Sequence, residues 1–97
     1  MPEGGAEAVV VRRRVVVRGR VQGVGFRMFV ASRAESRGVA GRVRNCADGA
    51  VEAELEGERD AVAAVVAACE AGPRGAHVSG LEVSDEAPTG MRGFEIR

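Results

Sequence analysis

Residues 51–56 read Val51-Glu52-Ala53-Glu54-Leu55-Glu56, the most regular alternation of apolar and acidic side chains in this 97-residue chain. Successive side chains of a strand point to opposite faces of a sheet, so the alternation predicts a strand with one buried face and one face toward water. The row of glutamates is interpreted as the solvated face.

The segments on either side of this strand predict a hairpin flanked by two helices. Val39–Asn45 is the expected preceding strand, and Asp48–Gly49 provides the turn. Phe26–Arg37 and Glu58–Ala71 carry apolar residues at helical spacing, and a glycine follows each of them.

Three further strands complete the predicted fold. Val9–Arg18 is rich in β-branched residues, and Val78–Val83 contains a possible bulge at Ser79–Gly80, where the alternation slips. Gly93–Ile96 is a short last strand, expected to bury both of its large apolar side chains. This order of elements predicts an α+β, ferredoxin-like split βαβ fold, with an antiparallel sheet and two helices on one face. The fold hosts many functions, so the site must decide between them.

Length and composition predict one domain over residues 9–97, preceded by a flexible tail at residues 1–8. The tail does not have the pattern of a signal peptide, and no apolar run is long enough to cross a bilayer, so no membrane partner is expected. The two cysteines, Cys46 and Cys69, are interpreted as small, buried, reduced residues of a cytoplasmic monomer. A net charge of zero argues against a purely electrostatic nucleic-acid binder.

Residues 19–27 form a glycine-rich loop that leads from a strand into a helix. The stretch reads Gly19-Arg20-Val21-Gln22-Gly23-Val24-Gly25-Phe26-Arg27. Glycines let the backbone curl around an anion, and a helix N-terminus adds unpaired N–H donors. Arg27 adds a planar guanidinium that matches phosphate oxygens. The loop therefore predicts a phosphate cradle, while the side chains of Arg20 and Gln22 are expected in water.

Other phosphate and metal motifs do not fit. The loop lacks the lysine of a Walker A motif, and Met28 stands where the dinucleotide fingerprint requires a third glycine. Neither cysteine has the arginine six residues later that a cysteine phosphatase requires. The single histidine, His77, makes a zinc site implausible, so no metal site is predicted.

Two motifs together resemble those of the acylphosphatase family. The first is the loop of residues 19–27, and the second is Gly41-Arg42-Val43-Arg44-Asn45 followed by Gly49, Val51 and Gly57. The resemblance extends from residue 9 to residue 97. It implies a ferredoxin-like fold, an acyl phosphate substrate, inorganic phosphate as product and inhibitor, and no metal or other cofactor.

The resemblance also assigns roles to residues. Arg27 corresponds to the phosphate-binding arginine and Asn45 to the asparagine that positions water. The residues predicted to bind the substrate phosphate through the loop are Val21, Gln22, Gly23, Val24, Gly25 and Phe26. Arg42 departs from the family, which usually has an aromatic residue there. By strand alternation Arg42 points away from the face of Val43 and Asn45.

The chemistry explains why no obvious acid, base or nucleophile is needed. Phosphoryl transfer through a loose transition state depends mainly on positioning and charge stabilisation. The leaving carboxylate has a conjugate acid of pKa about 4, so it departs without protonation. The amide of Asn45 can hold the attacking water, while Arg27 and the loop amides stabilise charge on the phosphoryl oxygens.

Two alternatives remain open. The first is a non-catalytic acylphosphatase-like binding or regulatory module, as occurs inside the larger hydrogenase-maturation carbamoyltransferase. This chain ends soon after the domain, so no attached partner domain is expected. The second is an RNA binder on the same fold, but such sheets stack bases on exposed aromatics, and the three phenylalanines fit core positions.

Overall fold

The alternating stretch lies at the centre of the sheet. The computed structural model describes residues 9–97, and the tail predicted for residues 1–8 lies outside the described residues. Val51–Glu58 forms β3, with Val10–Arg20 (β1) and Ala40–Asn45 (β2) paired antiparallel on its two sides. The apolar side chains of β3 are completely or almost completely buried, as the alternation predicts.

Two outer strands complete a five-stranded sheet in the order β4-β1-β3-β2-β5. His77–Glu86 forms β4, which pairs antiparallel with β1, and Phe94–Ile96 forms β5, which pairs parallel with β2. The predicted antiparallel sheet therefore holds for four strands, and β5 makes the whole sheet mixed. The register of β1 and β4 skips Ser79, so the predicted bulge is present.

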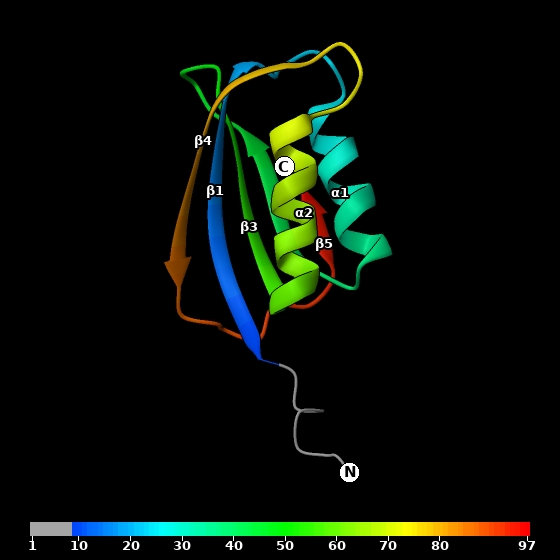
Figure 1. Cartoon of the computed structure of the whole chain (residues 1–97), viewed down its shortest axis with the longest axis vertical. Helices are drawn as coiled ribbons and strands as arrows, with labels where there is room; N and C mark the ends of the chain where they lie inside the picture. The colour runs from blue at the N-terminus through cyan, green and yellow to red at the C-terminus, as the bar shows by residue number, and fades with distance from the viewer. Residues whose placement is uncertain (1–8) are drawn as a thin grey trace.

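Both helices cover one face of the sheet, as the fold class predicts (Figure 1). Phe26–Ser36 forms α1 and Arg59–Ala71 forms α2. Glu58 caps α2 by accepting hydrogen bonds from the backbone N–H groups of the first turn. No helix within residues 9–97 has the length and apolar character needed to span a bilayer.

The core lies between the helices and the covered face of the sheet. Its fully buried members include Phe26 and Val30 from α1, and Val62, Val65 and Cys69 from α2. Burial raises the pKa of the Cys69 thiol to about 12, so this cysteine stays protonated at neutral pH. Cys46 is only half-buried, which corrects the expectation that both cysteines are buried.

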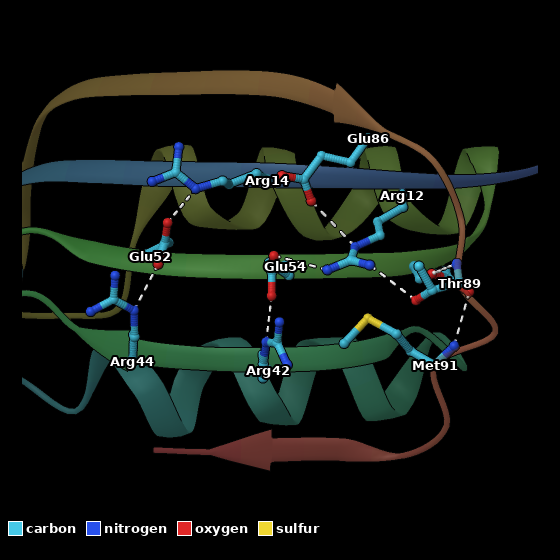
Figure 2. A network of polar contacts seen from close by, with 10 residues as sticks. Arg12, Arg14, Arg42, Arg44, Glu52, Glu54, Glu86, Thr89 and Met91 are labelled. Carbon is cyan, nitrogen blue, oxygen red and sulfur yellow. Dashed lines mark hydrogen bonds and ion pairs between the residues drawn. The ribbon is translucent and has the colours of Figure 1, made fainter.

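The opposite face of the sheet is covered by ion pairs (Figure 2). The glutamates of β3 are not a solvated row, because the side chains of Glu52 and Glu54 are only 12% and 17% exposed. Each lies between two arginines, one from β1 and one from β2. The pairs are Arg14–Glu52, Glu52–Arg44, Arg12–Glu54 and Glu54–Arg42. The expectation was wrong because the acidic strand has a basic strand on each side, and opposite charges on neighbouring strands attract.

Glu54 remains ionised despite its position. Burial raises its pKa, but hydrogen bonds from Arg42 and Arg12 outweigh burial, so the pKa of Glu54 lies below its usual range. Arg12 also approaches Glu86 of β4 at 3.3 Å, which extends the charge alternation across four strands. β4 is longer than the predicted Val78–Val83, and its last residues pair in register with the arginines of β1.

Glu56 joins β3 to the segment that leads from β4 to β5. It is 5% exposed and accepts hydrogen bonds from the backbone N–H groups of Thr89, Gly90 and Met91 at 2.9, 2.7 and 3.0 Å. The bond from Thr89 lowers the pKa of Glu56 most; burial opposes this effect, and the other two bonds add to it. This carboxylate holds the segment in place as it crosses from one edge of the sheet to the other.

The last strand differs from its prediction. Phe94 is half-buried against the core, but Ile96 is 41% exposed. The expectation that both would be buried was wrong because β5 is a three-residue edge strand with a neighbouring strand on one side only.

We predict that Glu56→Gln lowers the free energy of unfolding at pH 7 by about 1–2 kcal/mol, because an amide cannot accept three N–H bonds. The folded-state pKa of Glu56 is depressed, so its contribution is complete above the unfolded value of about 4.3 and is lost as pH falls through the folded value. Denaturant titrations should therefore show the difference between wild type and variant shrinking below about pH 4. Glu70→Gln, at an exposed site on α2, is the matched control. A difference that does not change with pH would contradict this account.

Candidate active site

The glycine-rich loop is fixed at both ends by buried side chains. β1 continues to Arg20, two residues beyond its predicted end, and α1 begins at Phe26. Val21 and Phe26 are 1% and 2% exposed, so the chain between them must bulge out of the core. Gly23 and Gly25 have φ values of 77° and 75°, which disfavour any residue with a Cβ. The space beside both glycines is open.

The amides of this loop are free to bind a ligand. Gly25 is the N-cap of α1 and provides no side-chain acceptor. The first N–H groups of a helix have no partner within the helix, and they carry partial positive charge. Among residues 9–97, the N–H groups of Gly23, Val24 and Gly25 donate no hydrogen bond. The loop and the helix start therefore present several donors to the same region.

The topology brings the second motif to this loop. β1 and β2 both run antiparallel to β3, so they are parallel to each other. Their C-terminal ends therefore lie at the same end of the sheet. The loop follows β1, and Asn45 is the last residue of β2. A hollow of about 190 Å³ lies between them. It is lined by Val21, Gly23, Gly25, Phe26, Arg27, Met28, Asn45 and Ile96.

Six of the eight predicted site residues line this hollow, and two do not. Gln22 and Val24 are absent from its lining. Val24 is half-buried and packs against the core. Arg27 and Asn45, which come from different motifs, are both present.

Arg27 contacts the residue that follows the last strand. Its Nη1 donates a hydrogen bond of 2.6 Å to the backbone carbonyl oxygen of Arg97. Among the described residues no acidic side chain forms an ion pair with Arg27. A guanidinium has five N–H donors, so the remaining ones are available to an anion.

Gln22 has a role that the sequence analysis missed. Its side-chain amide donates hydrogen bonds of 2.8 and 2.9 Å to the backbone carbonyls of Cys46 and Ala50. The expectation that this side chain lies in water was wrong, whereas Arg20 is exposed as expected. Gln22 therefore joins the glycine-rich loop to the turn that directly follows Asn45. Two hydrogen bonds thus set the distance between the two motifs.

Arg42 lies on the opposite face of the sheet. It pairs with Glu54 there, while its neighbour Val43 is fully buried under the helices. The predicted direction of Arg42 is confirmed, and its departure from the family pattern does not affect the hollow. A second hollow, of about 150 Å³, is lined by this pair together with Arg44, Glu52 and Arg97. Glutamates already pair with Arg42 and Arg44, which reduces their attraction for an anion.

Met28 and Ile96 also line the hollow, although the sequence did not predict them there. Met28 follows Arg27 on α1 and lies outside the apolar stripe of Phe26, Phe29 and Val30, which was an available signal of exposure. Ile96 gave no such signal, because alternation in a three-residue strand does not show whether the strand is covered.

Comparison with known proteins identifies the family of this chain. The family model described as Acylphosphatase matches residues 13–96. The chain belongs to the acylphosphatase family. Hydrolysis of acyl phosphates is the function of this family, so the predicted family, fold and enzyme class are confirmed.

Relatives of this acylphosphatase match it over most of their length. The acylphosphatase of Anaeromyxobacter dehalogenans is 57% identical over 88 residues, which cover 90% of this chain and 95% of that protein. The acylphosphatase of Trichormus variabilis is 46% identical over 97 residues, and the match covers 100% of this chain and 96% of that protein. The crystal structure of acylphosphatase from Bacillus subtilis has a TM-score of 0.87 at 39% identity, covering 90% of this chain and 98% of that one.

A similar domain also occurs within a larger protein. Full-length HypF in a phosphate- and nucleotide-bound form is 25% identical, with a TM-score of 0.85. The match covers 97% of this acylphosphatase but only 12% of the HypF chain. The same fold therefore occurs both as a small protein and as part of a much longer chain.

We predict that Gln22→Ala uncouples the two motifs of this acylphosphatase. Removing both hydrogen bonds should cost about 1–3 kcal/mol of stability and should speed amide hydrogen exchange at residues 46–51, because the turn loses its contact with the loop. Arg20→Ala, in the same region but exposed, is the control and should leave exchange in the turn unchanged. Unchanged protection of residues 46–51 in a folded Gln22→Ala protein would show that Gln22 does not hold the turn.

Proposed function

We propose that this chain hydrolyses acyl phosphates in the hollow between the glycine-rich loop and Asn45. The observation that carries the proposal is that Arg27 and Asn45, from two separate motifs, line one hollow beside the uncapped start of α1. The products are a carboxylate and inorganic phosphate.

The loop and Arg27 bind the phosphoryl group in this mechanism. The N–H groups of Gly23, Val24 and Gly25 donate no hydrogen bond within residues 9–97 and are available to phosphoryl oxygens, and Arg27 adds a positive charge. The two neutralise charge on the phosphoryl oxygens, and this stabilisation matters most in the transition state.

Asn45 positions the attacking water. Within residues 9–97 its side chain forms no hydrogen bond, so its amide is available to a water molecule at the hollow. The water oxygen forms a bond to phosphorus as the bond from phosphorus to the carboxyl oxygen breaks. The leaving carboxylate keeps the bonding electrons, and a phosphate oxygen of the substrate takes the proton.

Several narrower properties belong to the same proposal. No three potential metal ligands converge within residues 9–97, so we expect catalysis without a metal. The cradle recognises oxygens, so free phosphate should act as a competitive inhibitor. The ion pairs on the open sheet face and the absence of exposed aromatics there give nucleic-acid bases no stacking surface. We also expect a monomer, and the free cysteines suit the cytoplasm.

The proposed reaction can be tested with benzoyl phosphate, and p-nitrophenyl phosphate serves as the monoester control. We predict turnover of the anhydride, undiminished by EDTA. Turnover of the ester should be far slower, because a phenoxide is more basic than a carboxylate and is therefore a poorer leaving group. A loss of activity in EDTA that magnesium or zinc restores would contradict the mechanism. Phosphate binding without turnover would instead support the non-catalytic module.

Variants at the two central residues should separate their roles. Arg27→Ala should lose phosphate affinity and turnover together, and Arg27→Lys should restore little, because a point charge does not replace the planar fork. Asn45→Ala should lower kcat by roughly 10²-fold, while the inhibition constant of phosphate changes by only a few-fold. Thermal melting must accompany the kinetics, since Asn45 ends β2. A folded Asn45→Ala enzyme with normal kcat would refute the role of Asn45.

A further inference from the structure

Two exposed apolar side chains stand at the mouth of the hollow. Met28 is 66% exposed and Ile96 is 41% exposed. The other large apolar side chains with similar exposure in the described chain are Val9, Val10 and Val83, and none of these lines the hollow. Two of the five exposed large apolar residues in the described chain thus line the proposed phosphate site.

Met28 and Ile96 are the sequence neighbours of Arg27 and Arg97, which a hydrogen bond joins. Met28 follows Arg27 on α1, and Ile96 precedes Arg97 at the end of β5. That bond joins the first turn of α1 to the residue that follows β5, at 2.6 Å. Met28 and Ile96 therefore belong to two segments in contact with each other, next to the guanidinium proposed to bind phosphate.

The lining of the hollow divides into two parts by chemistry. The polar part consists of the loop backbone, Arg27 and Asn45, and the apolar part consists of Val21, Phe26, Met28 and Ile96. An acyl phosphate has the same division, with a charged phosphoryl end and an acyl end. If the phosphoryl group occupies the donors, the acyl group must extend toward the mouth, where it meets Met28 and Ile96 rather than charged side chains.

We propose that Met28 and Ile96 form an apolar rim that binds the hydrocarbon part of the acyl group. The rim selects acyl phosphates with aromatic or longer aliphatic acyl groups over acetyl phosphate. This inference rests on the proposed function and specifies its substrate class. Each additional buried methylene is worth about 0.8 kcal/mol, which corresponds to roughly fourfold in kcat/KM.

The test compares kcat/KM for acetyl, butyryl, hexanoyl and benzoyl phosphate in the wild type and in the double variant Met28→Gln, Ile96→Thr. Both substitutions keep the approximate size and the secondary-structure preference of the original residue. In the wild type kcat/KM should rise with acyl length, and in the double variant this rise should be reduced by about fivefold or more between acetyl and hexanoyl phosphate. Val83→Thr, an equally exposed apolar site on β4 away from the hollow, should leave the series unchanged.

The possible outcomes distinguish the rim from the reaction itself. Turnover of all four substrates with the same dependence on acyl length in wild type and double variant would overturn the rim alone. A wild-type series that does not rise with acyl length would also overturn it. No turnover of any acyl phosphate by the wild type would overturn the proposed function, and the inference with it.

Discussion

The burial of one face of the sheet beneath the two helices is the constraint on which the rest of this structure depends. Val15, Val43 and Leu55, from three neighbouring strands, are all completely buried on that face. Because strand side chains alternate, fixing these residues also fixes what appears on the other face, where rows of arginine and glutamate neutralise each other (Figure 2). The same constraint anchors Val21 and Phe26, so the glycine-rich chain between them must leave the core and form a loop.

The site then follows from the direction of the strands. β1 and β2 lie on either side of β3, run in the same direction and finish at the same end of the sheet (Figure 1). One motif follows β1 and the other ends β2, and Gln22 joins the two motifs with hydrogen bonds to the turn after Asn45. Arg27 is hydrogen-bonded in turn to Arg97, which follows the last strand. The geometry of the hollow in so small a protein thus depends on contacts between segments that are distant in sequence.

The sequence predicted those parts of the structure that depend on local pattern. Alternation identified β3, helical spacing identified α1 and α2, and the two motifs pointed to Arg27 and Asn45 at a common hollow. What it missed depends on partners elsewhere in the chain. The glutamates of β3 were expected in water because their pattern does not reveal the arginines on the strands beside them. The side chain of Gln22 was expected in water for the same reason, and Ile96 was expected to be buried although β5 is an edge strand with a neighbouring strand on one side only.

The central claim is that the loop, Arg27 and Asn45 form one anion site, and the position of bound inorganic phosphate tests it most directly. A crystal structure of the protein with phosphate should place the anion within hydrogen-bond reach of the amides of residues 23–27 and of the Arg27 guanidinium, with the side chain of Asn45 facing it. Phosphate bound only in the second hollow, among Arg42, Arg44 and Arg97, would contradict the account.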